Sequence, residues 1–200
     1  MNKKKYNLFP TLVSRYGGIL SLDEVKIIHQ YCLSQETYSH PVINGDSSSS
    51  YKSQSNILQE LELVIPELDG IIRKIYSTLD DYTSDLGIPP VHIGNNWFNI
   101  QGNGSVLQQH MHCRSILSAA LYLNVDEDSS TINFENPNPH ISYAYDENVS
   151  RNSEYLFQYY CLIPEPGDLI IFPSWLKHGS MYEENKTVNR TCISFNTINI

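Results

Sequence analysis

Apolar residues recur every three or four positions in two stretches of the first ninety residues. The first stretch follows Ser21-Leu-Asp-Glu24, in which the serine can cap a helix and the glutamate can bind back to the serine N–H. It therefore predicts a helix over residues 22–34. The second stretch covers residues 55–80 and contains Pro66, which lacks an N–H and clashes with the preceding turn. We expect two helices there, or one bent helix, lying against a sheet.

From about residue 91 the pattern changes to short apolar and aromatic segments separated by turns rich in glycine and proline. Residues 116–125 are apolar and uncharged, which is typical of a strand buried on both faces. The strands that we expect cover residues 91–93, 97–100, 106–113, 116–125, 131–134, 155–163, 169–172 and 190–198. Several short strands at regular spacing favour a sandwich or a barrel.

Three further segments carry weaker patterns. The apolar residues between Phe9 and Leu20 predict a short strand that adds to the edge of a sheet. Residues 34–54 are polar and rich in turn-forming side chains, so we expect a loop there. That loop is either an inert connection or a lid near the functional site. Residues 136–153 predict another loop, with a short strand near residues 141–145.

The order of these elements, helices first and strands second, predicts the fold class. We expect a mainly β protein with a jelly-roll, cupin-like architecture and N-terminal helices packed on the sheet. A chain of 200 residues makes a single domain over residues 1–200 the default. Within it we expect a helical cover over residues 1–90 and a jelly-roll core, carrying the catalytic site, over residues 91–200.

The charge balance narrows the class of partner. The chain has 13 basic and 22 acidic residues, a formal net charge of −9. Such a surface argues against a protein built mainly to bind nucleic-acid backbones or anionic membranes. The four cysteines form no C-x-x-C pair, and a chain of this length folds without disulfides, which fits a reducing compartment. With no secretory or membrane-spanning apolar run in the sequence, we expect a cytoplasmic protein.

The candidate chemistry lies in His110 and His112, two residues apart, and in His178, which follows 66 residues later. Side chains at i and i+2 share one face of an extended strand, so the pair can bind one metal ion. The third histidine is far enough along the chain to come from another strand. Imidazole suits iron, zinc, copper and nickel, and three protein ligands leave positions open for a substrate. The remaining histidines lack such a context and are left out of the site: His29, His40, His92 and His140.

Arg190, twelve residues after His178, is a candidate site for an anionic group. That distance allows a turn and a return strand into the same barrel. A guanidinium group binds a carboxylate through two parallel hydrogen bonds, so Arg190 can hold the far end of a dicarboxylate. The alternative is a surface arginine at the start of a strand.

Several segments together resemble the iron(II)/2-oxoglutarate-dependent oxygenases. They are Trp97-Phe-Asn, His110-Met-His, Leu-Ser-Ala-Ala-Leu-Tyr-Leu, Pro-Gly-Asp-Leu-Ile-Ile-Phe-Pro-Ser-Trp-Leu-Lys-His and Asn-Arg-Thr-Cys-Ile-Ser-Phe-Asn. The resemblance covers residues 91–198 and is strongest to a small family of oxygenases common in phages and marine bacteria, distantly like prolyl hydroxylases. It implies a double-stranded β-helix, Fe(II), 2-oxoglutarate and O2, with succinate and CO2 as products. A phage origin would place the protein in the host cytoplasm.

The resemblance also implies roles for individual residues. His110 and His178 match the two iron-binding histidines, and Arg190 matches the arginine that holds the C5 carboxylate of 2-oxoglutarate. His112 stands where most of the superfamily has Asp or Glu, so it either binds the iron itself or supports the site from outside the ligand sphere. Glu135 is a weaker candidate for the missing carboxylate. Cys192 occupies a position that is often serine, and Ser194 follows two residues on.

The sequence thus predicts a hydroxylating dioxygenase with His110, His112 and His178 as catalytic metal ligands. The candidates for binding the co-substrate or lining the pocket are Arg190, Tyr122, Asn99, Ser194 and Trp97. Two alternatives remain: a three-histidine cupin dioxygenase that does not use 2-oxoglutarate, and a non-catalytic jelly-roll module for binding or structure. The sequence does not name the primary substrate. The partners that we expect are the small-molecule co-substrate, a primary substrate that is not identified and a second copy of the chain in a homodimer, with no membrane and no bulk nucleic acid.

Overall fold

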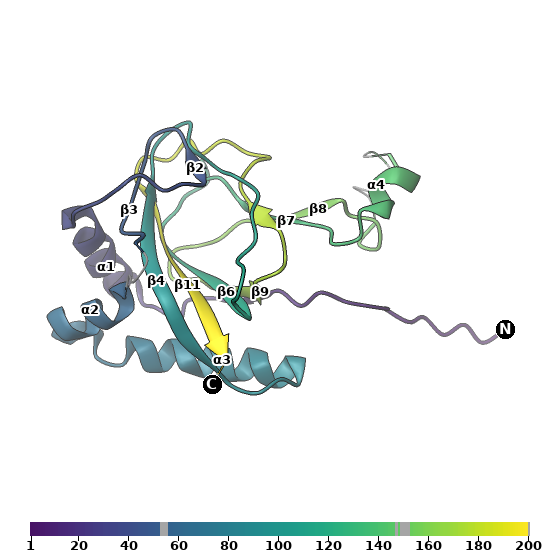
Figure 1. The fold of residues 1–200 in the computed structure, drawn as a ribbon, viewed down its shortest axis with the longest axis horizontal. Coiled ribbons are helices and arrows are strands. Elements are labelled where there is room, and N and C mark those ends of the chain that lie inside the picture. Colours follow the sequence, from purple (N-terminus) through teal and green to yellow (C-terminus); the bar gives the residue numbers. More distant parts are fainter. Residues whose placement is uncertain (53–55, 147, 149–152, 200) are drawn as a thin grey trace.

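Six strands form one antiparallel sheet in the computed structural model, which describes residues 1–52, 56–146, 148 and 153–199 (Figure 1). In spatial order they are β1 (Ser14–Tyr16), β9 (Leu169–Pro173), β6 (Leu117–Asn124), β11 (Arg190–Asn199), β4 (Val91–Gln101) and β3 (Ser47–Ser49). The two longest strands, β4 and β11, pair along almost their whole length, with Arg190 opposite Gln101 and Asn199 opposite Val91. This pairing gives the sheet its rigid centre.

Smaller sheets complete the jelly roll. One has the order β10 (His178–Gly179), β7 (Ile132–Glu135) and β8 (Tyr159–Leu162), and the other joins β2 (Ile43–Asn44) to β5 (Val106–Leu107). Apolar residues on β7 and β8 pack against the inward face of the large sheet, in a cluster that includes Ala120, Tyr122 and Phe172. The mainly β, jelly-roll fold expected from the sequence is therefore confirmed.

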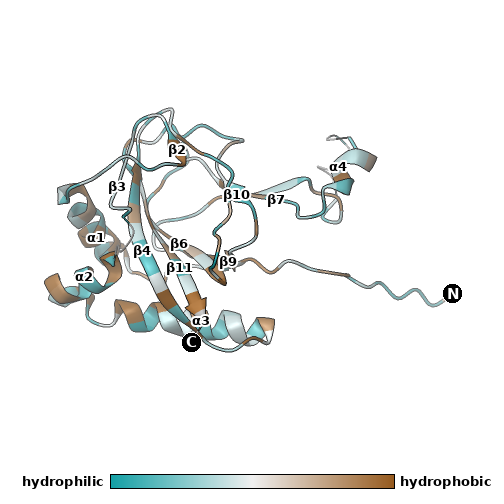
Figure 2. Cartoon of the chain, in the orientation of Figure 1, coloured by the Kyte–Doolittle hydropathy of each residue, from teal (hydrophilic) through white to brown (hydrophobic). Residues whose placement is uncertain are grey.

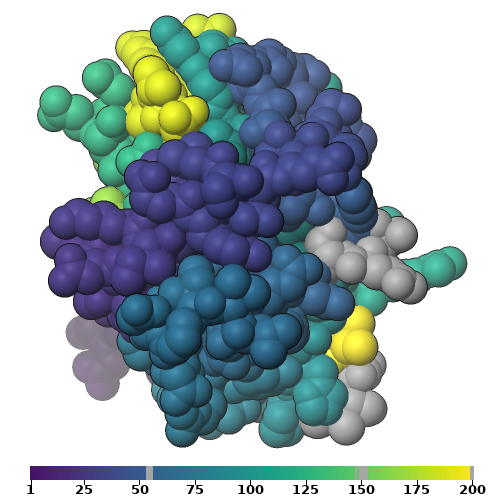
Figure 3. Space-filling view, turned by 90° about the vertical axis from the view of Figure 1, so that its left-hand side faces the viewer, coloured from purple at the N-terminus to yellow at the C-terminus, as the bar shows by residue number. Residues whose placement is uncertain are grey.

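The outer face of the large sheet is covered by the N-terminal helices. These are α1 (Leu22–Ser34), α2 (Ile57–Val64), a 3-10 helix (Pro66–Leu68) and α3 (Ile71–Leu86). Figure 2 shows that the helices carry apolar residues among polar ones, and Figure 3 shows the side of the molecule that the N-terminal half covers. Successive side chains of each strand point alternately to the helices and to the interior of the jelly roll. Leu117, Ala119 and Leu121 of β6 pack against helix residues, whereas Ala120 and Tyr122 face the interior of the jelly roll.

Local sequence signals set the helix boundaries. Ser21 Oγ accepts a hydrogen bond from the Glu24 N–H, and the Ser21 N–H donates to Glu24 Oε2, so the predicted capping box is present. Helix α2 ends at Val64 before Pro66, and α3 begins at Ile71. The prediction of two helices separated at this proline is confirmed. None of the helices in the described part of the chain is long and apolar enough to cross a membrane.

Three local predictions were wrong. Residues 34–54 are not only a loop, since β3 pairs with β4 and the hydroxyl of Ser49 donates to Phe98 O within the sheet. These serines fill a sheet edge, where polar side chains are tolerated. Residues 53 and 54 lie outside the described residues. The strand expected over 106–113 stops at Leu107, because only two residues pair with β2. The short strand expected near 141–145 is instead helix α4 (His140–Ala144).

Other boundaries differ by a few residues. Helix α3 extends beyond residue 80 to Leu86 and ends at Gly87, whose φ of 68° is in the left-handed region that glycine adopts without strain. Strand β8 is shorter than the predicted 155–163, because residues 154–156 form a turn. The edge strand expected between Phe9 and Leu20 is present as β1, paired with β9.

Candidate metal centre

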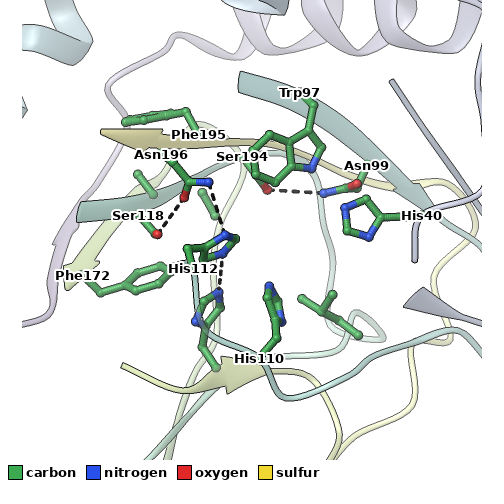
Figure 4. A pocket seen from close by; sticks show the side chains of 14 residues that line it. His40, Trp97, Asn99, His110, His112, Ser118, Phe172, Ser194, Phe195 and Asn196 are labelled. Carbon is green, nitrogen blue, oxygen red and sulfur yellow. Dashed lines mark hydrogen bonds between the residues drawn. The ribbon is translucent and has the colours of Figure 1, made fainter. Parts of the chain in front are cut away.

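Three imidazole rings meet at one end of the jelly-roll interior. The backbone of His110 pairs with that of His178, and the His112 N–H donates to Ser174 O at 3.0 Å. The ring centroids of the three histidines lie between 4.4 and 5.1 Å apart. One ligand nitrogen from each ring lies within 4.8 Å of the others, so the cluster can hold a metal ion (Figure 4).

Backbone carbonyls fix two of these rings. His110 Nδ1 lies 2.8 Å from Gln108 O, and His178 Nδ1 lies 2.8 Å from Leu176 O. A carbonyl oxygen only accepts hydrogen bonds, so each Nδ1 carries the proton and each Nε2 keeps a lone pair. A metal-binding histidine uses its other ring nitrogen in this way, as an N–H donor that sets ring orientation. The Nε2 lone pairs of His110 and His178 are thus available to a metal ion.

His112 is held differently, by the side-chain amide of Asn196. His112 Nδ1 lies 3.2 Å from Asn196 Nδ2, and Asn196 Oδ1 accepts from the Ser118 hydroxyl at 2.8 Å. In this arrangement Nδ1 accepts a hydrogen bond, so the proton lies on His112 Nε2, which is 3.3 Å from His178 Nε2. That tautomer links the two rings by a hydrogen bond but has no lone pair to give a metal.

A half-turn of the Asn196 amide produces the other tautomer. Oδ1 then accepts from His112 Nδ1–H, while Nδ2 donates to Ser118 Oγ. The Ser118 hydroxyl can accept this bond and donate to Ser174 Oγ, 2.8 Å away. The hydrogen bonds of Asn196 and Ser118 are all kept. Only the bond between the Nε2 atoms of His112 and His178 is lost, because both atoms then carry a lone pair that can face a metal ion. The chain Ser174–Ser118–Asn196 therefore supports His112 either as a donor to His178 or as a metal ligand.

Burial keeps the cluster neutral. Burial, with a smaller contribution from the neighbouring His110, lowers the pKa of His112 to about 4 and that of His178 to about 3. The pKa of His110 is lowered by the same burial. Imidazole lone pairs are thus available at neutral pH, and the donor set suits iron, zinc, copper or nickel. Glu135 does not supply a carboxylate ligand, since it pairs with Lys177 at 2.8 Å.

Three neutral ligands leave both charges of a divalent ion uncompensated. In the described residues, the group that can hold a metal contains no Asp or Glu beside the three histidines. A buried cation that lacks an anionic protein ligand favours an anionic external one. The cluster is therefore suited to bind a metal together with a carboxylate compound.

Arg190 lies farther along the same interior, at the start of β11. Its side chain is 4% exposed; Nε donates to Ser130 O at 3.2 Å and Nη1 donates to Gln101 Oε1 at 2.6 Å. The guanidinium carbon lies 5.3 Å from the centre of the Tyr122 ring. Burial raises the pKa of the Tyr122 phenol, so this side chain is uncharged. No carboxylate in the described part of the chain forms an ion pair with Arg190.

Small side chains separate Arg190 from the histidine cluster. Ala120 on β6 and Cys192 and Ser194 on β11 face the interior between them. Ser194 Oγ accepts from Asn99 Nδ2 at 3.3 Å, and Asn99 Oδ1 accepts from the Ser49 hydroxyl at 2.8 Å. Asn99 therefore positions Ser194 and is itself held by the sheet edge.

A cavity of about 40 Å³ lies against the cluster. It brings together most of the residues expected from the sequence: His110, His112, His178, Asn99, Ser194 and Trp97. Arg190 and Tyr122 do not line it; they contact each other deeper in the interior.

Sequence reasoning missed three residues of this site: His40, Ser118 and Asn196. Asn196 lies on the same face of β11 as Arg190 and Ser194, because an even number of residues separates these positions in the strand. The alternation of side chains along the predicted strand could therefore have identified it. No local signal marks His40. Its place at the cavity depends on β2 and β3, which were not predicted.

The comparisons with known proteins agree with this geometry. A family model described as "Putative 2OG-Fe(II) oxygenase" matches residues 95–196, just over half of the chain. No curated protein matches the sequence.

Solved structures share the fold at low sequence identity. HygX from Streptomyces hygroscopicus, with nickel and 2-oxoglutarate bound, is 12% identical with a TM-score of 0.64, over 94% of this chain and 83% of that chain. A prolyl-4-hydroxylase from Pseudomonas putida is 16% identical with a TM-score of 0.58, over 95% and 94%. The non-heme alpha ketoglutarate dependent epimerase SnoN from nogalamycin biosynthesis is 12% identical with a TM-score of 0.64, over 94% and 79%.

Proposed function

Because this chain belongs to the 2OG-Fe(II) oxygenase family, we propose that it is a dioxygenase that hydroxylates a substrate still to be identified. The family's metal is Fe(II) and its co-substrate is 2-oxoglutarate. The proposal rests on one observation: among the residues that the structure describes, buried Arg190 has no acidic partner, and it lies on the same inward face as a cluster of three neutral histidines. A buried cation without a counter-ion is costly, so this side chain is suited to an anionic ligand.

We propose that Nε2 of each of His110, His112 and His178 binds the iron. For His110 and His178 this uses the tautomers already set by the carbonyls of Gln108 and Leu176. The Nε2 atoms of His112 and His178 lie 3.3 Å apart, close enough for both to bind one ion. His112 then takes the place of the usual carboxylate.

Arg190 is proposed to hold the C5 carboxylate of 2-oxoglutarate. The guanidinium has five N–H donors, and its bonds to Ser130 O and Gln101 use two of them. The Tyr122 ring and these two bonds restrict the orientation of the group. Ala120, Cys192 and Ser194 leave space for the chain of the co-substrate, and the Ser194 hydroxyl, held by Asn99, is a further polar contact.

When Fe(II) and 2-oxoglutarate are bound, they supply the oxidation: O2 gives one oxygen atom to the substrate and one to succinate, and CO2 is released. The protein fixes the ligand geometry, neutralises the far carboxylate and excludes water from the site.

The test is an anaerobic titration of the protein with Fe(II) and 2-oxoglutarate, followed through the visible metal-to-ligand charge-transfer band of the chelate. We expect the band in the wild type. Arg190→Met should weaken 2-oxoglutarate binding by at least about 30-fold, because a buried charge loses its partner. Arg73→Met is the matched control, since Arg73 is exposed on α3 and should leave the band unchanged.

Two other outcomes correspond to the alternative functions. Iron bound without the band would indicate a three-histidine dioxygenase that does not use 2-oxoglutarate. Failure to bind iron at stoichiometric amounts would indicate a non-catalytic jelly-roll module.

A further inference from the structure

Two N–H groups in the wall of the cavity have no hydrogen-bond partner among residues 1–52, 56–146, 148 and 153–199. They are Nε2 of His40 and Nε1 of Trp97, and both atoms are buried. The side chains are 9% and 3% exposed, and both line the cavity beside the histidine cluster. Figure 4 shows them on the side of the cavity away from Phe172.

Both atoms are donors. The indole nitrogen of Trp97 can only donate. The Val42 N–H donates to His40 Nδ1 at 3.4 Å, so the proton of this ring lies on Nε2. Burial lowers the pKa of His40 to about 4, which leaves the ring neutral near pH 7.

Packing holds the two donors in place. The rings of His40 and Trp97 are stacked, with centroids 6.3 Å apart and an interplanar angle of 18°. Tyr51 packs against both, at 4.9 Å from His40 and 5.0 Å from Trp97. Trp97 in turn lies 6.2 Å from the ring of His112. The donors are thus rigid and next to the metal centre.

The chemistry of the cavity limits what they can bind. A buried N–H without a partner costs free energy, so a ligand that offers an acceptor oxygen gains by meeting it. The lining of this cavity contains no Lys, Arg, Asp or Glu. A charged group in it would have no counter-ion besides the metal, which favours an uncharged acceptor.

The position also separates this pair from the proposed co-substrate site. Trp97 belongs to β4, and His40 precedes β2, next to the β3 edge of the sheet. Arg190 and Tyr122 lie on β11 and β6 and do not line the cavity that His40 and Trp97 line.

We propose that His40 and Trp97 form a recognition subsite for an uncharged carbonyl oxygen of the primary substrate, as found in an amide. This inference rests on the function proposed above, because it takes the histidine cluster as the reactive centre. The pair would orient the substrate so that a carbon near its carbonyl group faces the metal. Substrates whose only polar groups are charged are excluded from this subsite.

The experiment uses the full chain loaded with Zn(II), which is diamagnetic, and 2-oxoglutarate. N-methylacetamide is titrated as the probe while the two indole N–H signals are followed by proton–nitrogen NMR. The chain has two tryptophans, and Trp175, 54% exposed, is the internal control. The variant Trp97→Phe assigns the signals. We expect a saturable downfield shift of the Trp97 signal and none of the Trp175 signal.

His40→Phe should weaken the binding of N-methylacetamide by about fivefold, the effect of losing one hydrogen bond. Acetate should give no shift.

Each other outcome overturns the inference. Equilibrium dialysis of the same sample establishes whether 2-oxoglutarate is bound. If it is bound and N-methylacetamide leaves the Trp97 signal unchanged, the subsite is wrong while the proposed function stands. A shift caused by 2-oxoglutarate alone, with no further change on adding the amide, would assign the donors to the co-substrate. If 2-oxoglutarate does not bind at all, the proposed function fails and this inference fails with it.

Discussion

The backbones of His110 and His178 hold each other in register: the N–H of each donates to the carbonyl oxygen of the other, at 2.9 and 3.0 Å. Two rings from distant parts of the sequence are therefore placed by main-chain geometry rather than by their own side chains. The adjacent carbonyls of Gln108 and Leu176 then fix the ring tautomers. His112 lacks such a tether, so it is the adjustable member of the cluster.

Substitution of His112 tests whether it is a ligand. If it binds the metal, His112→Ala should weaken Fe(II) binding by more than the about 10- to 100-fold that is typical of a residue outside the ligand sphere. His112→Asp should restore much of the affinity, since a carboxylate is also a ligand for iron. Competition with a chelator under anaerobic conditions measures the affinity. Unchanged binding in His112→Ala would show that the iron is held without this residue.

Asn196 is expected to act on the metal through the tautomer of His112. Asn196→Leu removes the acceptor for Nδ1–H and should weaken metal binding by about 10- to 100-fold. Asn196→Asp provides a side chain that only accepts, so it should bind metal at least as tightly as the wild type. Nitrogen NMR of the zinc-loaded protein reports the protonated ring nitrogen directly. Equal affinities in the Leu and Asp variants would contradict this role.

Acid should destabilise the metal-free protein. The folded-state pKa of His178 is about 3, and those of His40 and His112 are about 4, all below the ordinary value of 6.5. The unfolded chain therefore binds more protons, and the free energy of unfolding falls as the pH drops below about 6.5 toward 4. Above about pH 6.5 these histidines are neutral in both states, so their contribution to the free energy of unfolding no longer changes with pH. Urea unfolding at a series of pH values measures the slope.

The control variant for this measurement is His140→Asn, at an exposed position outside the histidine cluster. His178→Asn should reduce the slope. A free energy of unfolding that is constant between pH 7 and 5 would show that these histidines are not held neutral by burial.

A buried carboxylate at the β1 edge makes a prediction about stability. Asp168 is 2% exposed; its Oδ2 lies 2.6 Å from Arg15 Nε and accepts from the Glu165 N–H at 2.8 Å. Asp168→Ala leaves these donors without a partner and should lower the free energy of unfolding by about 3 kcal/mol. Glu165→Ala removes the exposed partner of the same arginine and should cost less than about 1 kcal/mol. Equal losses in urea unfolding would refute the distinction.

The sequence predicted the fold where periodic patterns are long. Helix α1 follows from its capping box, the break at Pro66 from the chemistry of proline, and the buried strand β6 from an uncharged apolar run. The short strands β2 and β3 were missed because pairing with β5 and β4, rather than their own composition, makes them strands. A polar serine run carries no periodic signal for an edge strand.

The same limit applies to the candidate site. His110, His112 and His178 could be named in advance, because two lie at strand spacing and the third follows a buried strand. His40 could not, since its place beside Trp97 depends on the fold of residues 34–52. The contact between Arg190 and Gln101 also comes from strand register, which joins residues 89 positions apart.

The most direct test of the account is a crystal structure of the protein grown anaerobically with Fe(II) and 2-oxoglutarate. We expect one iron bound by Nε2 of His110, His112 and His178, with the amide oxygen of Asn196 facing His112 Nδ1. We also expect the C5 carboxylate of 2-oxoglutarate on the guanidinium of Arg190. An iron bound by only two histidines, or a co-substrate whose far carboxylate avoids Arg190, would contradict it.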